Sequence, residues 1–201
     1  MSGNARDVVL VDAGGTNISS VRYALNRLGV DAGLTSDAGR IRAATHVILP
    51  GVGAAAPGMR RLRETGLDEV LRNITQPILG VCLGMQLLFE RSEEGDTTCL
   101  GLLPGTVAHL RGGPGLRIPH MGWNTVACLR EDPLLAALPV NAHAYFVHSF
   151  AAPVGPCTIA SARHGEAFSA VVRKDRICGM QFHPERSGEV GARLLANFLD
   201  L

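Results

Sequence analysis

Short apolar runs alternate with amphipathic stretches along the first half of the chain. Residues 8–11, 45–49 and 78–81 are predominantly apolar, as buried strands are. Between the first two runs, apolar positions recur at the spacing of a helix, for which residues 18–28 are the clearest case. Strands that alternate with helices are typical of βαβ units, which form parallel sheets. The pattern therefore predicts an α/β fold with a mostly parallel central sheet flanked by helices.

The second half of the chain follows a different pattern. From residue 101 to residue 129, short apolar segments are broken by Gly and Pro, which indicates short antiparallel strands or a lid added to the parallel sheet. Segments 167–173 and 177–182 flank a charged turn and predict a β-hairpin. No repeat or low-complexity linker interrupts the pattern, so we expect one domain over residues 1–201. The other expected elements are strands at 31–35, 144–148 and 158–161, and helices at 59–70, 83–89, 132–138 and after Ser187.

Polar and glycine residues mark the ends of the first expected helix. Asn17 is placed to cap its start and Gly29 to end it. The turn before it, residues 14–17, is of a kind that can receive a phosphate at a helix N-terminus, but it lacks the full dinucleotide-binding fingerprint. A plain turn is therefore the favoured interpretation. Gly66 is a weak point inside the helix expected at 59–70.

A Gly-x-Cys-x-Gly sequence at residues 80–84 lies where an apolar run gives way to a helical pattern. Its two glycines allow the sharp strand-to-helix turn known as a nucleophile elbow. Such a turn holds the Cys82 thiol at a helix N-terminus, where the macrodipole favours a thiolate. It also leaves the backbone N–H of Leu83 free to face an oxyanion. Taken alone, the pattern is equally typical of a buried structural cysteine.

The sequence His183-Pro184-Glu185 supplies a base and a group to orient it. In an extended chain, residues i and i+2 point to the same side, so the Glu185 carboxylate can approach the His183 imidazole. Pro184 biases His183 towards an extended conformation. Alone, the sequence is more typical of an exposed charged pair at a strand end. Together with the elbow cysteine, it favours a Cys-His-Glu triad.

The sequence Pro50-Gly51-Val52-Gly53 follows a predicted strand. Glycines on both sides of Val52 permit positive φ and allow a peptide to rotate, so a second oxyanion donor is expected here. The alternative is an ordinary turn between a strand and a helix.

Composition and charge narrow the classes of function. The net charge is +1 with no long run of one sign, which argues against a nucleic-acid partner. Neither an apolar signal-peptide core nor an apolar stretch long enough to span a bilayer is present, so no membrane association is expected. The five cysteines are scattered without a Cys-x-x-Cys pair, which favours a reduced, cytoplasmic protein without disulfides. The histidines show no metal-ligand spacing, and we expect neither a metal nor a cofactor.

In combination, these motifs resemble the class I, triad-type glutamine amidotransferases. Residues 80–86 resemble the nucleophile motif of that family, 182–185 its acid–base motif and 50–53 its oxyanion strand, and the resemblance covers nearly the whole chain. It implies a flavodoxin-like α/β fold and hydrolysis of glutamine to glutamate and ammonia. The residues that it implies are Cys82, His183 and Glu185 for catalysis, Val52 and Leu83 for the oxyanion hole, and Gly51, Gly53, Gln86, His148, Ser149 and Phe150 for substrate binding.

Two further stretches, residues 119–124 and 145–150, resemble the glutaminase subunits of imidazole glycerol phosphate synthase from histidine biosynthesis. That resemblance implies a heterodimer with a (β/α)₈-barrel cyclase subunit. The cyclase would use the ammonia to convert phosphoribulosyl-formimino-AICAR-phosphate into imidazole glycerol phosphate and AICAR. The residues expected at the partner interface are His120, Met121, Trp123 and Asn124.

Alternatives to this interpretation remain open from the sequence. Trp123 is also compatible with a core position. The chain could serve another acceptor synthase, or act as a scaffold with a silent site, although the intact triad disfavours a silent site. Two departures from the family pattern are the first turn, Asp-Ala-Gly-Gly-Thr-Asn at 12–17 where an aromatic often follows the aspartate, and Arg186 where lysine is common.

Overall fold

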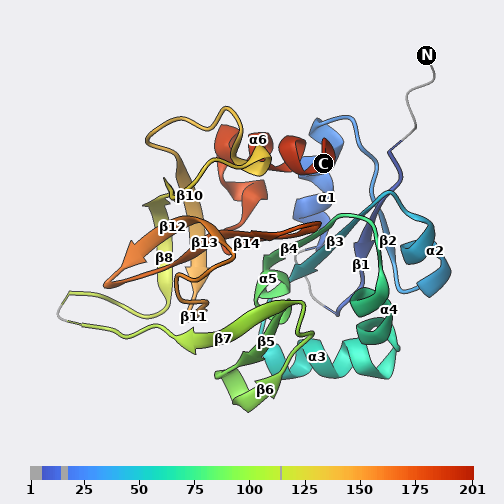
Figure 1. The fold of residues 1–201 in the computed structure, drawn as a ribbon, viewed down its shortest axis with the longest axis horizontal. Helices are drawn as coiled ribbons and strands as arrows, with labels where there is room; N and C mark the ends of the chain where they lie inside the picture. Colours follow the sequence, from blue (N-terminus) through green and yellow to red (C-terminus); the bar gives the residue numbers. More distant parts are fainter. Residues whose placement is uncertain (1–5, 15–17, 114) are drawn as a thin grey trace.

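The computed structural model describes residues 6–14, 18–113 and 115–201. An eight-stranded sheet with the order β2-β1-β3-β4-β14-β13-β12-β9 forms its centre (Figure 1). Five adjacent strands, β2, β1, β3, β4 and β14, run parallel to one another. The remaining strands β13, β12 and β9 each run antiparallel to the strand before them in the sheet. The bounds are β1 Val8–Val11, β2 Gly33–Thr35, β3 His46–Gly51, β4 Ile78–Cys82, β9 Ala127–Cys128, β12 Thr158–His164, β13 Glu166–Lys174 and β14 Ile177–Met180. The parallel centre and the β13–β14 hairpin agree with the sequence prediction, whereas only β9 of the described strands between residues 101 and 129 joins this sheet.

Helices cover both faces of the sheet, because the buried strands are apolar on both sides. In β1, Val8 and Leu10 pack in one core with α1 and α6, whereas Val9 and Val11 pack in a second core with α2, α3, α4 and α5 (Figure 1). The helix bounds are α1 Ile18–Arg27, α2 Ala38–Ala43, α3 Ala55–Glu64, α4 Leu67–Asn73, α5 Leu83–Leu87 and α6 Gly188–Leu199.

Two smaller sheets lie beside the central one. A four-stranded sheet has the order β11-β7-β5-β6, and β10 pairs with β8 in a two-stranded antiparallel ribbon. Three short 3₁₀ turns complete the elements. The bounds are β5 Phe89–Ser92, β6 Thr97–Thr98, β7 Leu103–His109, β8 His120–Thr125, β10 His143–His148, β11 Phe150–Ala151, η1 Glu94–Asp96, η2 Pro133–Leu135 and η3 Pro184–Arg186.

Three expected helices differ from the structure. The single helix at 59–70 is two helices, because Gly66 adopts a left-handed conformation with φ of 68° and separates α3 from α4. The helix expected at 83–89 ends at Leu87, and Phe89 begins β5 instead. The segment 132–138 forms only the turn η2, capped by the Asp132 side chain. The expected cap Asn17 lies outside the described residues.

The turn from β4 into α5 depends on close backbone packing. Cys82 joins the two elements with a positive φ of 54°. A Cβ on Gly80 would lie 2.6 Å from the Gly84 carbonyl oxygen, and one on Gly84 would lie 1.8 Å from the Leu49 carbonyl oxygen. Both distances are far shorter than a van der Waals contact, so the two glycines let α5 lie directly against β3 and β4.

Replacing Gly84 by alanine is therefore expected to lower the free energy of unfolding by roughly 3 kcal/mol or more, because the added methyl group meets rigid backbone. Denaturant titration of the purified chain measures this change. Gly33→Ala is the matched control, since a Cβ at Gly33 meets nothing within 4 Å. A Gly84→Ala variant as stable as Gly33→Ala would show that α5 is not packed against β3 as described.

Candidate active site

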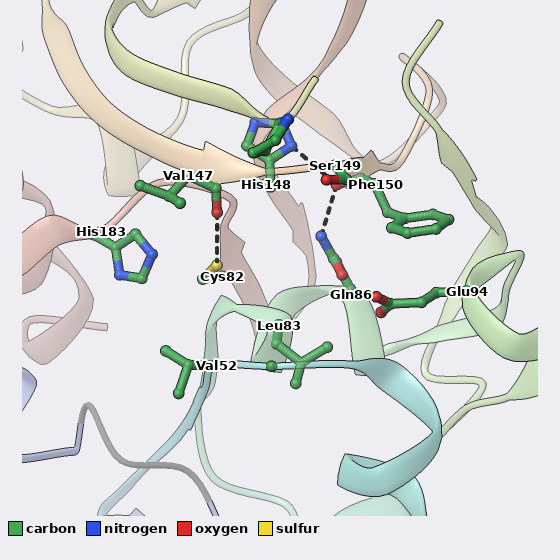
Figure 2. Close-up of a pocket in the computed structure, with 12 residues that line it drawn as sticks. Val52, Cys82, Leu83, Gln86, Glu94, Val147, His148, Ser149, Phe150 and His183 are labelled. Carbon is green, nitrogen blue, oxygen red and sulfur yellow. Dashed lines mark hydrogen bonds between the residues drawn. The ribbon is translucent and has the colours of Figure 1, made fainter. Parts of the chain in front are cut away.

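A pocket of about 300 Å³ lies at the carboxyl ends of β3 and β4. That edge of a parallel sheet is where α/β proteins usually bind ligands. The loop after β3, the start of α5, η1, the end of β10 and the segment after β14 contribute its lining (Figure 2). The lining residues are Val52, Gly53, Cys82, Leu83, Gln86, Glu94, Pro119, Val147, His148, Ser149, Phe150 and His183.

The Cys82 thiol lies in this pocket at the tip of the elbow. Its sulfur is 3.9 Å from the Val147 carbonyl oxygen, and the residue is buried. Figure 2 shows the Cys82 and His183 side chains facing the same space from different elements. The predicted turn thus places a thiol where it can meet both a base and a ligand.

His183 is held by hydrogen bonds on both its ring and its backbone. Its Nδ1 is 2.9 Å from Glu185 Oε1, and both side chains are buried. The backbone N–H of His183 donates to the Tyr145 carbonyl, and the Ser187 hydroxyl donates to the His183 carbonyl. The expected contact between His183 and Glu185 is present, although the chain reaches it through the turn η3 rather than by continuing as a strand.

The surroundings of His183 favour its protonated form. Burial acts to lower the pKa of His183, but interactions with Cys82 and Glu185 outweigh it and raise that pKa to about 10. The imidazole is therefore a cation at neutral pH. A cationic imidazole beside a cysteine sulfur stabilises the thiolate, which is the nucleophilic form of the side chain.

The amide of Gln86 has a fixed orientation in the pocket wall. Its nitrogen donates to the Phe150 carbonyl at 2.8 Å and to Gln181 Oε1 at 3.1 Å, which uses both of its hydrogens. The side-chain oxygen of Gln86 is therefore the atom that it presents to a ligand. Sequence reasoning missed Gln181, a polar residue directly after an apolar run that the structure shows to be fully buried.

The two expected oxyanion residues lie together in the pocket. Gly51 pairs with Cys82 across β3 and β4, so Val52 emerges beside the elbow, and Leu83 begins α5. Gly51 differs from the expectation of a substrate contact, because it is not among the lining residues of this pocket. A Cβ on Gly51 would lie 2.8 Å from the Gly84 backbone nitrogen, so its smallness serves the packing of the elbow.

Glu94 enters the pocket from η1, and sequence reasoning missed it. Its Oε2 accepts a hydrogen bond of 2.8 Å from the Ala55 backbone N–H at the start of α3. The carboxylate therefore stands at a defined position in the wall opposite the triad residues. In the sequence, the polar segment around Glu94 is typical of a plain turn. Glu94 reaches the site only because this segment packs against α3.

The chain matches the family model described as glutamine amidotransferase class-I over residues 9–201. The chain belongs to the class I glutamine amidotransferase family. It is 60% identical over 195 residues to the imidazole glycerol phosphate synthase subunit HisH of Xanthomonas axonopodis pv. citri (strain 306), covering 97% of this chain and 98% of that one. The HisH subunit of Xylella fastidiosa (strain Temecula1) is 55% identical over the same share of each chain.

Solved structures resemble this amidotransferase in fold at low identity. A putative GMP synthase protein from Thermoplasma acidophilum superimposes with a TM-score of 0.75 at 20% identity, covering 98% of this chain and 94% of the other. A crystal structure described as a glutamine amidotransferase gives a TM-score of 0.74 at 22% identity, covering 96% and 97%. These likenesses support the fold.

The four residues expected at a partner interface divide between two faces of β8. Met121 and Trp123 are 64% and 58% exposed, so Trp123 is not a core residue of this amidotransferase. His120 is only 4% exposed, and its side chain bonds to His148 and Asn124 inside the protein. Side-chain contact between His120 and a partner therefore does not fit the structure, because alternate residues of a strand face opposite sides.

The half-buried Tyr145 and the exposed Arg186 extend the surface around Trp123. The Tyr145 ring packs edge-on against Trp123 with centroids 6.0 Å apart, and the Arg186 guanidinium lies 4.1 Å from the centre of the Tyr145 ring. We call Met121, Trp123, Tyr145 and Arg186 the β8 face. Sequence reasoning assigned no role to Tyr145, which β10 brings opposite Trp123.

The described part of this amidotransferase contains neither a candidate metal-binding cluster nor a candidate membrane-spanning helix. No group of three or more His, Cys, Asp or Glu side chains among these residues is arranged to hold a metal ion. None of the described helices is long and apolar enough to cross a membrane.

Proposed function

We propose that this chain is the glutaminase subunit of imidazole glycerol phosphate synthase. It hydrolyses glutamine to glutamate and ammonia and supplies the ammonia to a cyclase subunit in histidine biosynthesis. The observation that carries the proposal is the convergence of Cys82 and the bonded His183–Glu185 pair in one pocket. Membership of the family and near full-length identity to HisH subunits support the same reaction.

In the proposed reaction, Cys82 acts as the nucleophile. Its thiolate attacks the side-chain amide carbon of glutamine, and backbone N–H groups of Leu83 and Val52 bind the oxyanion. His183 delivers the thiol proton to the leaving ammonia, which leaves a thioester on Cys82. His183 then takes a proton from water, and the resulting hydroxide cleaves the thioester to glutamate. Glu185 orients the imidazole and stabilises its charge.

The proposed substrate contacts follow from the acceptors and donors in the wall. Gln86 presents its side-chain oxygen, and Glu94 presents a carboxylate. Both are acceptors, so together they suit the α-ammonium group of glutamine. Gly53, His148, Ser149 and Phe150 line the same pocket and are proposed as further substrate contacts.

The proposed partner is a (β/α)₈-barrel cyclase subunit bound at the β8 face. Exposed aromatic and arginine side chains are the residue types that dominate the binding energy of protein interfaces. Met121 and Trp123 are the exposed apolar members of the face, and Tyr145 and Arg186 support them. The proposal is a cytoplasmic heterodimer in which residues 1–201 form one amidotransferase domain.

Trp123→Ala is expected to weaken the dependence of glutamine hydrolysis on partner and acceptor while the melting temperature stays nearly unchanged. The reason is that the indole is exposed and stabilises the isolated chain little. A buried tryptophan would instead cost about 3–5 kcal/mol on truncation. Glutamate release with and without cyclase and acceptor gives the coupling ratio. Tyr23→Ala, which removes another exposed aromatic ring, is the matched control and should leave that ratio unchanged.

The function itself is tested by measuring glutamate release from glutamine with the cyclase subunit and its acceptor. We expect release to depend on the partner and to match the imidazole glycerol phosphate formed. Glutamate release that responds only to another synthase would indicate a different acceptor. A correctly folded chain that releases no glutamate in the presence of any partner would indicate a silent scaffold.

A further inference from the structure

Three hydrogen bonds lead from the β8 strand to the pocket. Asn124 Nδ2 lies 3.2 Å from His120 Nε2, His120 Nδ1 lies 3.1 Å from His148 Nε2, and His148 Nδ1 lies 2.9 Å from the Phe150 carbonyl oxygen. The two imidazoles are buried among aromatic rings. The triad side chains take no part in these bonds, and the mechanism proposed above does not use His120 or Asn124.

The partners at the pocket end of this hydrogen-bonded chain determine its direction. A carbonyl oxygen only accepts, so His148 Nδ1 carries a hydrogen. In a neutral imidazole the other nitrogen then accepts, so His120 Nδ1 donates to His148 Nε2. By the same rule, His120 Nε2 accepts from Asn124. All three donors therefore point the same way, towards the pocket.

The far end of the hydrogen-bonded chain fixes the same direction independently. Asn124 Nδ2 also donates to the Arg163 carbonyl at 2.8 Å, and its Oδ1 accepts from the Thr125 backbone N–H at 2.8 Å. These bonds orient the amide so that its nitrogen faces His120. Each member is thus satisfied in one arrangement only, which is how buried polar networks specify a unique geometry.

Both imidazoles must be neutral for this arrangement, because a protonated ring would direct a donor at a donor. Burial lowers the pKa of His120 to about 4 and that of His148 to about 3. His164, which stacks on His120, and His183 act on these rings in the same direction. At neutral pH the surroundings therefore keep both rings in the form that the hydrogen bonds require.

The hydrogen-bonded chain ends on a group that also holds a proposed substrate contact. The Phe150 carbonyl that accepts from His148 is the carbonyl that accepts from Gln86. The other end lies on the strand that carries Met121 and Trp123, whose side chains face outward while His120 faces inward. Strand β8 thus carries both the exposed Met121 and Trp123 side chains of the β8 face and the first residues of the hydrogen-bonded chain to the pocket.

We propose that His120 and Asn124 are positioning residues for glutamine binding, acting through His148 and the Phe150 carbonyl on Gln86. The inference rests on the proposed function for its substrate. Without the His120 donor, His148 Nε2 is a buried acceptor with no partner. The ring then gains by rotating Nε2 away from the leucine side chain, which weakens the bond from Nδ1–H to the Phe150 oxygen. The carbonyl shifts, and Gln86 loses its partner.

The test compares His120→Leu with His120→Asn in the complex with cyclase and acceptor. Leucine removes the donor, whereas the asparagine amide nitrogen takes the place of imidazole Nδ1 and keeps it. For His120→Leu we expect KM for glutamine to rise about tenfold or more, with a smaller change in kcat. His120→Asn should restore most of the affinity. The matched control is His164→Phe, which keeps a ring stacked on His120 and removes the bond to the Arg117 carbonyl but no bond of the hydrogen-bonded chain.

A second readout reports on the imidazole directly. Two-dimensional ¹H–¹⁵N spectra of the histidine rings should place the His148 hydrogen on Nδ1 in all three proteins, and the chemical shift of that hydrogen should change only in His120→Leu, where its bond to the Phe150 carbonyl weakens. Alkylation of Cys82 by iodoacetamide should be unchanged in all three, which shows that the elbow is intact. If His120→Leu does not fold, Asn124→Ala at the more exposed end should raise KM severalfold.

Two results would contradict the positioning role of His120 and Asn124. A wild-type His148 with its hydrogen on Nε2 excludes the direction of the hydrogen-bonded chain. An unchanged KM in folded His120→Leu, or in Asn124→Ala where His120→Leu does not fold, excludes the positioning role. If the wild-type complex releases no glutamate at all, the proposed function fails instead, and the ring spectra still report whether the hydrogen-bonded chain exists.

Discussion

Cys82→Ala is expected to abolish glutamine hydrolysis while synthesis driven by added ammonia survives in the complex. The alanine side chain cannot form a thioester, and removing a nucleophile typically costs about 10⁴–10⁶-fold in kcat. The fold should persist, because only the sulfur is removed from a small buried side chain. Measuring imidazole glycerol phosphate formation with glutamine, and then with an ammonium salt, separates the two activities.

Controls for this prediction come from the other thiols. Cys128→Ser, at an exposed position on the edge strand β9, should leave both activities unchanged. Burial raises the pKa of Cys99 to about 11 and that of Cys178 to about 12, so these thiols stay protonated at neutral pH. A glutamine-mimicking electrophile should therefore label Cys82 in preference to these two thiols. Mass spectrometry that placed the adduct on Cys99 or Cys178 would refute the assignment.

His183→Ala is expected to reduce glutamine hydrolysis by about 10²–10⁴-fold, and by at least as much as Glu185→Ala. His183 transfers protons to and from the reacting groups, whereas Glu185 acts only through the 2.9 Å bond to its ring. Loss of His183 also removes the imidazole whose protonated form the neighbouring Cys82 and Glu185 side chains favour. Steady-state kinetics of both variants in the complex shows which substitution reduces glutamine hydrolysis more.

The matched control for His183→Ala is His143→Ala, which removes an exposed imidazole bonded to the Asn141 carbonyl. It should leave kcat unchanged. A Glu185→Ala variant with lower kcat than His183→Ala would mean that the two roles are assigned wrongly.

The parts of the site that could be predicted from sequence depend on short-range geometry. The elbow follows from the two glycines around Cys82, because they alone fit the close approach of α5 to β3 and β4. The His183–Glu185 contact spans only three residues. Both features depend only on residues that are close together in the sequence, so a short motif is enough to predict them.

The missed residues depend on packing between distant segments. Glu94 reaches the pocket because η1 is anchored on α3 through the Ala55 N–H, a bond between residues far apart in sequence. Gln181 supports the wall residue Gln86 only because β14 lies next to β4 and brings the two side chains together. Of the four residues expected at the interface, His120 has a buried side chain, because strand alternation divides consecutive residues between two faces.

The positive φ of Cys82 has a consequence for how far this protein can be stabilised. A side chain held in that region typically costs about 1–3 kcal/mol, a sizeable fraction of the roughly 5–15 kcal/mol by which a domain is stable. Glycine at this position would relieve the backbone and remove the nucleophile in the same substitution. Selection for thermostability alone would therefore work against the residue that the reaction needs, and a stable variant that keeps its activity must gain its stability away from the elbow.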